Sequence, residues 1–556
     1  MRLADSSPPA GTDRAPGAGG DAPLAEAILS GGWDTERDLV VLVGAGPAAA
    51  TAALRRLGQQ RILWFRTGDD GSGEPLGGVI RVDHLDEVAA AVRALGALGP
   101  DRITGRALEP AHARLYDQVV ARIERARSER FLSGDQAAAD TARARIQHGL
   151  ANLPALCRWS GASALGSALA GTPMMIVAPG PSLARNIDAL AELQGRALLL
   201  ALSHSLGPLR RAGITPDFVL AADAHDVTHH LVGEDLSGVA GMVVAATAHP
   251  HMFHSAAPRH LALVEPGPID SWLARLAGET GAGAPGIAPG GGSVAHTALA
   301  LALAWGCDPV GFVGLDLSFP GGRCYVESSA DAGVRAVLSA DGRALSLEGW
   351  RDPGHRGRAP GAERLVEMPG WDGNPLPSSF HFSMCQRWFE ETARRVAGKV
   401  RLYNCSEGGA YIGGMRHIRL TGLTGRLLQA SRKDPIAAAE RVIGQLDPVA
   451  QRRAARERLV ELMLDLRRLP ALTSRELDGA ASALPILSTL VETELGTTPH
   501  GASVAADAER RRAALNRWAG WLEPRVVEAE RALAREDRAS ETARLRPLTA
   551  AAGKLA

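Results

Sequence analysis

Glycine, serine and proline residues cluster in two turns that could bind a nucleotide phosphate. The first turn follows the apolar run MMIVA, and the second opens the apolar segment VAHTALALALA. Glycine lets a ligand approach the main chain closely, and the N–H groups at a helix start attract anions. A capping serine at a strand–helix junction explains the first turn equally well, whereas a ligand-binding role is favoured for the second, which belongs to the same series of turns. The residues concerned are Gly180, Pro181, Ser182, Gly291, Gly292 and Ser293.

Carboxylates end two further apolar runs in the same region. Asp223 follows FVLAA, and Asp316 follows VGL. Asp223 is the first candidate for a general base that takes a proton from a substrate hydroxyl, and His225 is the next candidate. Asp316 is suited either to hold a sugar hydroxyl or to cap a turn. Because these turns occur in series, we expect them to converge on the site of a nucleotide-dependent enzyme.

Histidines are concentrated around the second of these runs, since nine of the 16 lie between His204 and His296. His225, His229 and His230 accompany Asp226, and such a set could bind a metal ion if the stretch were helical. Neither an HExxH pattern nor a companion cysteine strengthens that interpretation. We therefore predict no metal site, and favour histidines that line a cleft for an anionic ligand.

Apolar runs alternate with helical segments through the middle of the chain. This alternation predicts an α/β fold with a doubly wound, mostly parallel sheet. In such a sheet, ligands bind outside the carboxyl ends of the strands, where the turns described above would lie. The predicted strands are Met174–Ala178, Ala197–Leu202, Asp217–Ala222, Met242–Ala246, Leu261–Val264 and Val310–Val313, with a helix over Val294–Ala304.

Composition shifts divide the chain into four expected regions. Residues 1–25 are rich in proline and glycine and are expected to be disordered. Residues 26–150 are expected to form a degenerate Rossmann-like domain, with a helical connector from Asp101. Its glycine turn lacks an acidic partner for a ribose, which favours a structural role. Residues 151–420 form the predicted central domain, with a loop-like insertion at 320–373, and residues 421–556 a helical domain.

Charge and cysteine content exclude several classes of protein. The 61 basic and 61 acidic residues cancel, so no global basic field is available for nucleic acid. The five cysteines form no CxxC pair, which suits a reducing compartment. The N-terminus lacks the apolar core of a signal peptide, and the most apolar stretch is interrupted by His296, Asp308 and Pro309. We expect a cytoplasmic protein without membrane insertion.

The ordered motifs resemble those of the motility-associated factor (Maf) flagellin glycosyltransferases, which share a domain family with 6-hydroxymethylpterin diphosphokinase-like proteins. The resemblance covers most of the chain. It rests on the segments GPSL, GITPD, GGSVAHTALALA, VGLDLS, VEMPGWDGNPLPSS and NCSEGGAYIGG. It implies a central domain similar to bacterial sialyltransferases. The implied reaction moves a nonulosonic acid, of pseudaminic or legionaminic type, from a CMP-sugar to flagellin or a related secreted acceptor, with no further cofactor.

The resemblance implies roles for individual residues of this chain only through their positions in the shared motifs. The resemblance implies that the GPSL turn and the GGS turn contact the nucleotide. Ser203 stands where the sialyltransferases have an asparagine, and Glu407 lies in the SEGGAYIGG segment of the implied substrate site. Members of the family commonly have a histidine after the VGLDLS-like strand, where this chain has Cys324 and Tyr325.

Two other functions remain open. A pterin diphosphokinase-like enzyme would need Mg²⁺ and ATP, but the chain has AADAH where such enzymes carry an acidic DLDG-like cluster. A non-catalytic flagellar or polysaccharide assembly factor is the third interpretation, and the absent histidine favours it.

Overall fold

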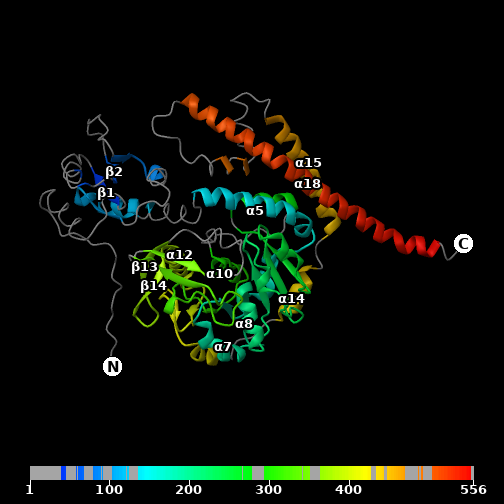
Figure 1. The fold of residues 1–556 in the computed structure, drawn as a ribbon, viewed down its shortest axis with the longest axis horizontal. Helices are drawn as coiled ribbons and strands as arrows, with labels where there is room; N and C mark the ends of the chain where they lie inside the picture. Colours follow the sequence, from blue (N-terminus) through cyan, green and yellow to red (C-terminus); the bar gives the residue numbers. More distant parts are fainter. Residues whose placement is uncertain are drawn as a thin grey trace. The chain divides into compact units, whose positions relative to one another are not determined.

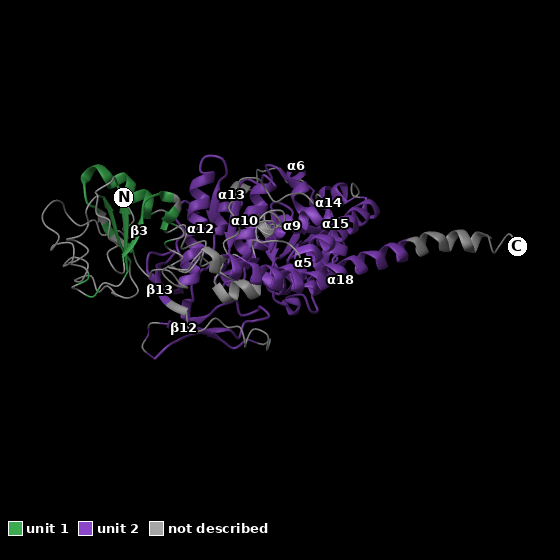
Figure 2. Ribbon diagram, turned by 90° about the horizontal axis from the view of Figure 1, so that it is seen from above, with its two compact units in different colours: residues 1–138, 492–503 green, residues 139–491, 504–556 purple. Residues whose placement is uncertain are grey.

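The chain divides into two compact units, which Figure 2 shows in green and purple. One comprises residues 1–138 and 492–503, and the other residues 139–491 and 504–556. The computed structural model describes residues 39–44, 61–67, 79–88, 103–120, 135–265, 267–278, 293–340, 344–350, 363–427, 434–443, 447–469 and 504–552, with single positions between them. The expected tail at 1–25 and the glycine turn after Gly44 lie outside the described residues.

The first unit contains a parallel four-stranded sheet of order β3-β2-β1-β4. Every residue of the first strand is buried, as the apolar run DLVVLV predicts. The helical connector expected from Asp101 is wrong at its start, because ITGRA pairs with β1 as a strand. The strands are β1 (Leu39–Gly44), β2 (Ile62–Arg66), β3 (Val79–Val82) and β4 (Ile103–Ala107).

The second unit is built on a parallel sheet of eight strands, in the order β16-β15-β10-β5-β6-β7-β8-β9. All six strands predicted for the central domain are present to within about a residue, and the α/β doubly wound class is confirmed. The strands are β5 (Met174–Val177), β6 (Leu198–Leu202), β7 (Phe218–Ala221), β8 (Gly241–Ala245), β9 (His260–Leu263), β10 (Val310–Val313), β15 (Leu402–Asn404) and β16 (Arg416–His417).

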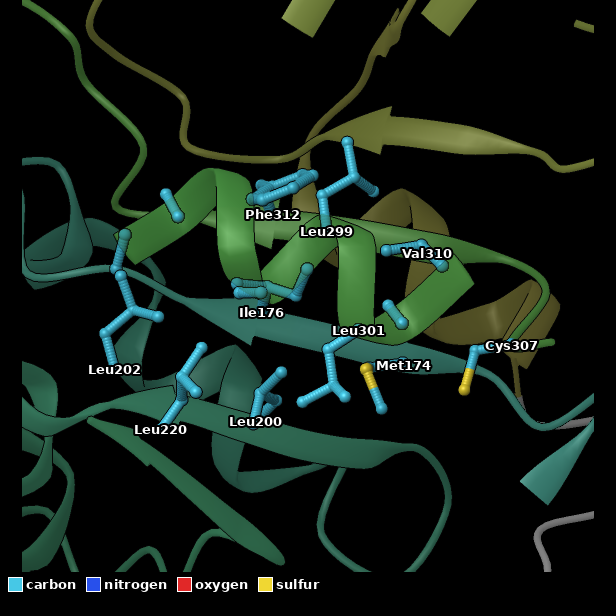
Figure 3. Close-up of a cluster of buried hydrophobic side chains, with 14 of the residues drawn as sticks. Met174, Ile176, Leu200, Leu202, Leu220, Leu299, Leu301, Cys307, Val310 and Phe312 are labelled. Carbon is cyan, nitrogen blue, oxygen red and sulfur yellow. The ribbon is translucent and has the colours of Figure 1, made fainter. Parts of the chain in front are cut away.

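Helices cover both faces of this sheet (Figure 1). Side chains alternate along a strand, so Met174 and Ile176 of β5 pack on one face and Met175 and Val177 on the other. The first face carries α10 (Val294–Ala304), whose Leu299 and Leu301 lie over β5, β6 and β10 in Figure 3. The second face carries α7 (Leu183–Ala191). Both faces of the strands are therefore buried, which explains their continuous apolar sequences.

An antiparallel sheet of order β11-β12-β13-β14 occupies much of the segment expected to be a loop-like insertion. The loop prediction for residues 320–373 is therefore wrong over β11, β12 and β13, whereas β14 lies beyond it. Ser339 N–H donates to the carbonyl of Ala344, and Gly342 adopts φ +67° between them, so a tight hairpin joins the first pair. The strands are β11 (Arg335–Leu338), β12 (Ala344–Glu348), β13 (Glu363–Pro369) and β14 (Pro375–Ser379).

Helices complete the second unit. The segment beyond residue 421 is helical where described, as predicted, and α15 packs along α18 (Figure 1). No helix among the described residues is both long and apolar enough to cross a bilayer. The helices are α5 (Asp135–Leu156), α6 (Gly166–Leu169), α8 (Leu206–Arg211), α9 (Pro268–Ala277), α12 (Phe380–Val396), α13 (Leu420–Leu427), α14 (Pro435–Ile443), α15 (Pro448–Arg468) and α18 (Val504–Ala552).

Candidate functional site

A cavity of about 260 Å³ opens at the carboxyl ends of β5, β6, β7 and β10. This is the edge at which doubly wound sheets bind their ligands. The start of α10 and the segment after β10 form the remaining walls. Residues lining the cavity include Gly180, Ser203, His204, Asp223, His230, Ser293, Asp316, Tyr325, Asp331, Trp350 and Phe382.

The cavity brings together five of the predicted site residues, which come from four strand ends and one helix start. These are Gly180, Ser203, Asp223, Ser293 and Asp316. Among the described residues, Pro181, Ser182, His225 and Glu407 are not part of its lining. Gly291 and Gly292 lie outside the described residues. The series of turns thus converges as the sequence predicts, although individual residues differ in role.

Asp316 holds the turn at Gly180 rather than presenting a carboxylate freely to a ligand. Its Oδ2 accepts a hydrogen bond from the main-chain N–H of Ser182 at 2.8 Å, and the side chain is 4% exposed. Burial raises the pKa of this carboxyl, although hydrogen bonding to Ser182 opposes the shift. The start of α7 therefore already has an acidic partner from its own chain. The phosphate-binding role expected for Ser182 has to compete with this carboxylate.

The backbone around Asp316 is tightly fixed. Leu317 adopts φ +47°, a left-handed conformation that costs a branched residue free energy. Hydrogen bonds to the carbonyls hold it there: Ala410 N–H donates to Asp316 at 2.7 Å and Ser378 Oγ donates to Leu317 at 2.7 Å. Gly409 packs so closely that a Cβ on it would lie 2.3 Å from the Cα of Asp316. Such over-determined strain is typical of functional sites.

Glu407 acts behind the cavity. Its Oε1 accepts hydrogen bonds from Asn186 Nδ2 of α7 and from the main-chain N–H of Leu420, both at 3.0 Å. The second of these satisfies an N–H group at the start of α13, where a carboxylate is favoured. Glu407 thus joins α7 to α13 and does not line the cavity.

Ser293 caps the helix whose start faces the cavity. Its Oγ accepts a hydrogen bond from the N–H of Ala295 at 3.3 Å, and Ser293, Val294 and Ala295 all line the cavity. Positive partial charge at the start of α10 therefore points toward the space that a ligand would occupy. Of the two predicted helix starts, α10 is the one placed to support an anion.

Asp223 and His225 form a carboxylate–imidazole pair at the rim. Oδ1 of Asp223 accepts from the main-chain N–H of His225 at 2.8 Å and lies 2.9 Å from its Nδ1. The Asp223 side chain is 37% exposed, and the residue lines the cavity. Both candidates for the general base therefore lie in the same turn after β7, and Asp223 is the one that lines the cavity.

A second group of polar side chains lies in the inner wall, and the sequence analysis singled out only His229 and His230 among them. Oδ2 of Asp331 lies 3.4 Å from Nε2 of His204, 3.3 Å from Nε2 of His230 and 3.0 Å from Nε2 of His229. We call His204, His229, His230 and Asp331 the inner histidine cluster. Imidazole hydrogen bonds and charge hold the pKa of Asp331 far below its usual range despite burial, whereas burial lowers the pKa of His230. Asp331 is 101 residues from its nearest partner, so local sequence carried no signal.

The segment that replaces the expected histidine contributes aromatic and thiol groups. Tyr325 packs on His204 with ring centroids 4.2 Å apart, and on Trp350 at 6.1 Å. Burial raises the pKa of the Cys324 thiol to about 12. A thiol in that state stays protonated at neutral pH and is a poor nucleophile. Histidine is nevertheless present at the site, because His204 and His230 reach it from the β6 and β7 sides.

Residues 147–322 match the family model for MptE-like proteins, described as 6-hydroxymethylpterin diphosphokinase MptE-like. These residues form an MptE-like domain. The resemblance noted in the sequence is thereby confirmed at the level of this domain. No curated protein matches the chain. The solved structure of a Maf glycosyltransferase from Magnetospirillum magneticum AMB-1 is similar over 90% of this chain and 78% of that chain, with 15% identity and a TM-score of 0.39. A likeness this distant assigns no chemistry to the chain.

The MptE-like domain supplies only part of the cavity. Its strand ends carry Ser203, His204, Asp223 and His230. Asp331 and the aromatic wall, formed by Tyr325, Trp350 and Phe382, follow after residue 322. Part of the cavity wall therefore comes from residues outside the segment that matches the family model.

Proposed function

We propose that this protein is a glycosyltransferase that moves a nonulosonic acid, of pseudaminic or legionaminic type, from a CMP-sugar to a serine or threonine of flagellin or a related surface acceptor. The observation that carries the proposal is the cavity at the strand ends, which combines a helix start, an accessible carboxylate and an aromatic wall. The helix start can stabilise the leaving phosphate, the carboxylate can take the proton of the acceptor hydroxyl, and the aromatic wall can pack against the nucleotide base.

The donor half of the reaction fits the α10 side of the cavity. Departure of CMP places negative charge on its phosphate, and a preorganised helix dipole stabilises that charge without reorganisation. Ser293 lies at this helix start. Tyr325, Trp350 and Phe382 offer apolar and aromatic surface on which a nucleotide base can pack. The donor would thus bind between α10 and the segment after β10.

The acceptor half fits the rim at Asp223. An acceptor hydroxyl must lose a proton as it attacks the anomeric carbon of the sugar, and a positioned carboxylate can take that proton. The main-chain N–H of His225 donates to Asp223 and orients its carboxylate at the rim, where the side chain is partly exposed. A protein acceptor would approach this rim, because its hydroxyl must enter while its main chain stays outside.

The diphosphokinase alternative is less well supported by the site. Mg²⁺ prefers oxygen ligands in near-octahedral geometry. The ionised carboxylate in the inner wall is instead faced by three imidazole groups, and Oδ2 of the buried Asp316 accepts a hydrogen bond from the main-chain N–H of Ser182. A non-catalytic role remains the outcome if no nucleotide binds.

The deciding experiment compares CMP, UDP and ATP with Mg²⁺ as stabilisers of the full chain in a thermal unfolding assay. A ligand that binds only the folded state raises the unfolding temperature by mass action. We expect the largest rise with CMP. A rise with ATP and Mg²⁺ but none with CMP would support the diphosphokinase, and no rise with any of them would support the assembly factor.

A matched pair of helix-capping serines then tests the location of the site. Ser293→Ala and Ser379→Ala each remove an N-cap, at α10 and α12, and each should cost about 0.5–2 kcal/mol of stability. Only Ser293 lines the cavity. We expect CMP affinity measured by calorimetry to fall by about twofold to tenfold in Ser293→Ala, as for one neutral hydrogen bond, and to stay unchanged in Ser379→Ala. Equal affinities in the two variants would contradict the α10 assignment.

A further inference from the structure

The inner histidine cluster brings three imidazole groups to one buried carboxylate. Three imidazole Nε2 atoms lie 3.0–3.4 Å from a single carboxylate oxygen, Oδ2 of Asp331. Nε2 of His229 and of His230 are its hydrogen-bond partners, whereas Nε2 of His204 accepts a hydrogen bond from the main-chain N–H of Asp331 at 3.4 Å. The lone pair of His204 Nε2 therefore already faces Asp331, and an ion bound here would take the place of that N–H. The side chains of His204, His230 and Asp331 are 9%, 8% and 3% exposed, so the three groups are shielded from water.

We propose that His204, His230 and Asp331 bind one divalent transition-metal ion, of the Zn²⁺ class, in the inner wall of the cavity. One ligand atom from each of these residues lies within 4.8 Å of the other two. Bonds of ~2.0–2.2 Å to a tetrahedral ion place neighbouring ligand atoms about 3.3–3.6 Å apart. The distances from Oδ2 of Asp331 to the two Nε2 atoms, 3.4 and 3.3 Å, agree with that spacing.

The donor set selects the class of ion. Two imidazoles and one carboxylate suit zinc, cobalt, nickel or iron(II), whereas Mg²⁺ and Ca²⁺ prefer oxygen ligands alone. Three protein ligands leave a coordination position open, and these residues line the cavity rather than a closed core. An open position facing a pocket is typical of zinc sites that bind an exchangeable water or substrate oxygen. The ion would therefore accept an oxygen ligand from the cavity.

Hydrogen bonding around the cluster prepares His230 for this role. Its Nδ1 lies 3.2 Å from Oγ of Ser203. A metal-binding histidine usually donates its other ring N–H to such a neighbour, which fixes the tautomer and keeps the Nε2 lone pair for the ion. Ser203 thus becomes a positioning residue for the metal ligand, a role different from the nucleotide contact expected from the sequence.

One local movement is required. The rings of His204 and His230 are stacked 4.1 Å apart with 4° between their planes, so their Nε2 lone pairs run nearly parallel. Binding one ion needs the two rings to tilt toward each other. Nε2 of His229 also lies 3.0 Å from this oxygen, but His229 is not one of the three proposed ligands.

The test measures metal binding by the tag-free full chain after removal of metals with a chelator, without nucleotide or acceptor. Its result is therefore independent of the proposed transferase activity. After dialysis against Zn²⁺, we expect one tightly held ion per chain by mass spectrometry, and a higher unfolding temperature. The Co²⁺ form should show visible d–d absorption in the wild type. Absence of a bound ion, of stabilisation and of the cobalt spectrum would overturn the proposal.

Substitutions locate the ion. Asp331→Asn keeps the shape of the side chain but removes its charge, and His230→Gln removes a ring ligand; both should lose the ion. The control is Asp226→Asn, which alters a second, more exposed group formed with His249 and His251. This variant should keep the tightly held ion. Circular dichroism in chelator checks that each variant folds. Retention of the ion by folded Asp331→Asn and His230→Gln, or its loss in Asp226→Asn, would refute the assignment.

Discussion

The substitution Gly409→Ala tests how closely the segment after β15 is packed against the floor of the cavity. Gly409 has φ +73°, and a Cβ there would lie 2.3 Å from Cα and 2.5 Å from the carbonyl oxygen of Asp316. These are main-chain atoms that cannot rotate away. Hydrogen bonds from Ala410 to Asp316 and from Trp371 to Gly409 resist any shift of either segment.

The expected magnitude is the sum of two costs. A left-handed conformation costs an L-residue roughly 1–2 kcal/mol. Overpacking of a fixed site adds about 1–3 kcal/mol. We therefore expect Gly409→Ala to lower the free energy of unfolding by about 2–5 kcal/mol. Because Asp316 lines the cavity, the displaced turn should also weaken CMP binding.

Gly398→Ala is the matched control, since Gly398 has φ +76° but no atom lies within 4 Å of the position that its Cβ would take. It should cost only the conformational part, roughly 1–2 kcal/mol, without any change in CMP affinity. Both values come from guanidinium unfolding followed by circular dichroism, with affinity from calorimetry. If Gly409→Ala is no more destabilising than Gly398→Ala, the close packing of Gly409 on Asp316 is refuted.

Three further predictions address catalysis, pH and ion pairing. Asp223→Asn should lower the rate of sugar transfer by about 10²–10⁴-fold and leave the CMP affinity unchanged. Mass spectrometry of the acceptor measures the transfer, and a near wild-type rate would rule out Asp223 as the base. Burial lowers the pKa of His260 below its ordinary value of 6.5. Protonation of His260 therefore favours the unfolded chain. The stability that comes from burying the neutral ring is present above pH 6.5 and is lost as the pH falls below it. Denaturation at pH 7 and pH 5 should therefore show a smaller acid-induced loss in His260→Gln than in the wild type, and equal losses would contradict this. Asp537→Asn should destabilise by about 2–3 kcal/mol, because Arg452, which is 4% exposed, and the neighbouring Arg456 both lose their ion pair with Asp537. Glu523→Gln at the exposed pair with Arg467 should cost below about 1 kcal/mol, and equal losses in the two variants would contradict the role of burial.

The central sheet was predictable because its signal is local. Each buried parallel strand is a continuous apolar run that ends in a turn, as in MMIVAPG, and the run identifies the strand without knowledge of its neighbours. The convergence of Gly180, Ser203, Asp223 and Asp316 followed from the same reasoning, since parallel strands end at one edge.

The antiparallel sheet was missed for a physical reason that the sequence partly reveals. Strands β11 and β12 are short and largely exposed, so they lack an apolar run. The pair Asp341-Gly342 between them is nevertheless a typical hairpin signal. ITGRA in β4 was similarly hidden, because it lies beside helical sequence and carries an arginine.

The inner histidine cluster was beyond local inference. Asp331 meets His204 and His230 only because the chain after β10 returns across the ends of β6 and β7, over separations of 127 and 101 residues. The roles of Asp316 and Glu407 were also set by tertiary contacts, since each carboxylate is engaged by main-chain N–H groups of another segment. Residue type alone does not separate a carboxylate that faces a ligand from one that holds a turn.

The contact between Gly409 and Asp316 has a consequence for how the protein is made. Residues 147–322 leave the ribosome before Gly409, Ala410 and Ser378, which together hold the strained carbonyls of Asp316 and Leu317. A nascent chain that stops at the end of the MptE-like domain contains six of the eight strands of the parallel sheet, but not the residues that complete the floor of its cavity. Competence to bind a ligand should therefore appear late in synthesis, after the strand β15 has added to the edge of β10 and the loop behind it has closed.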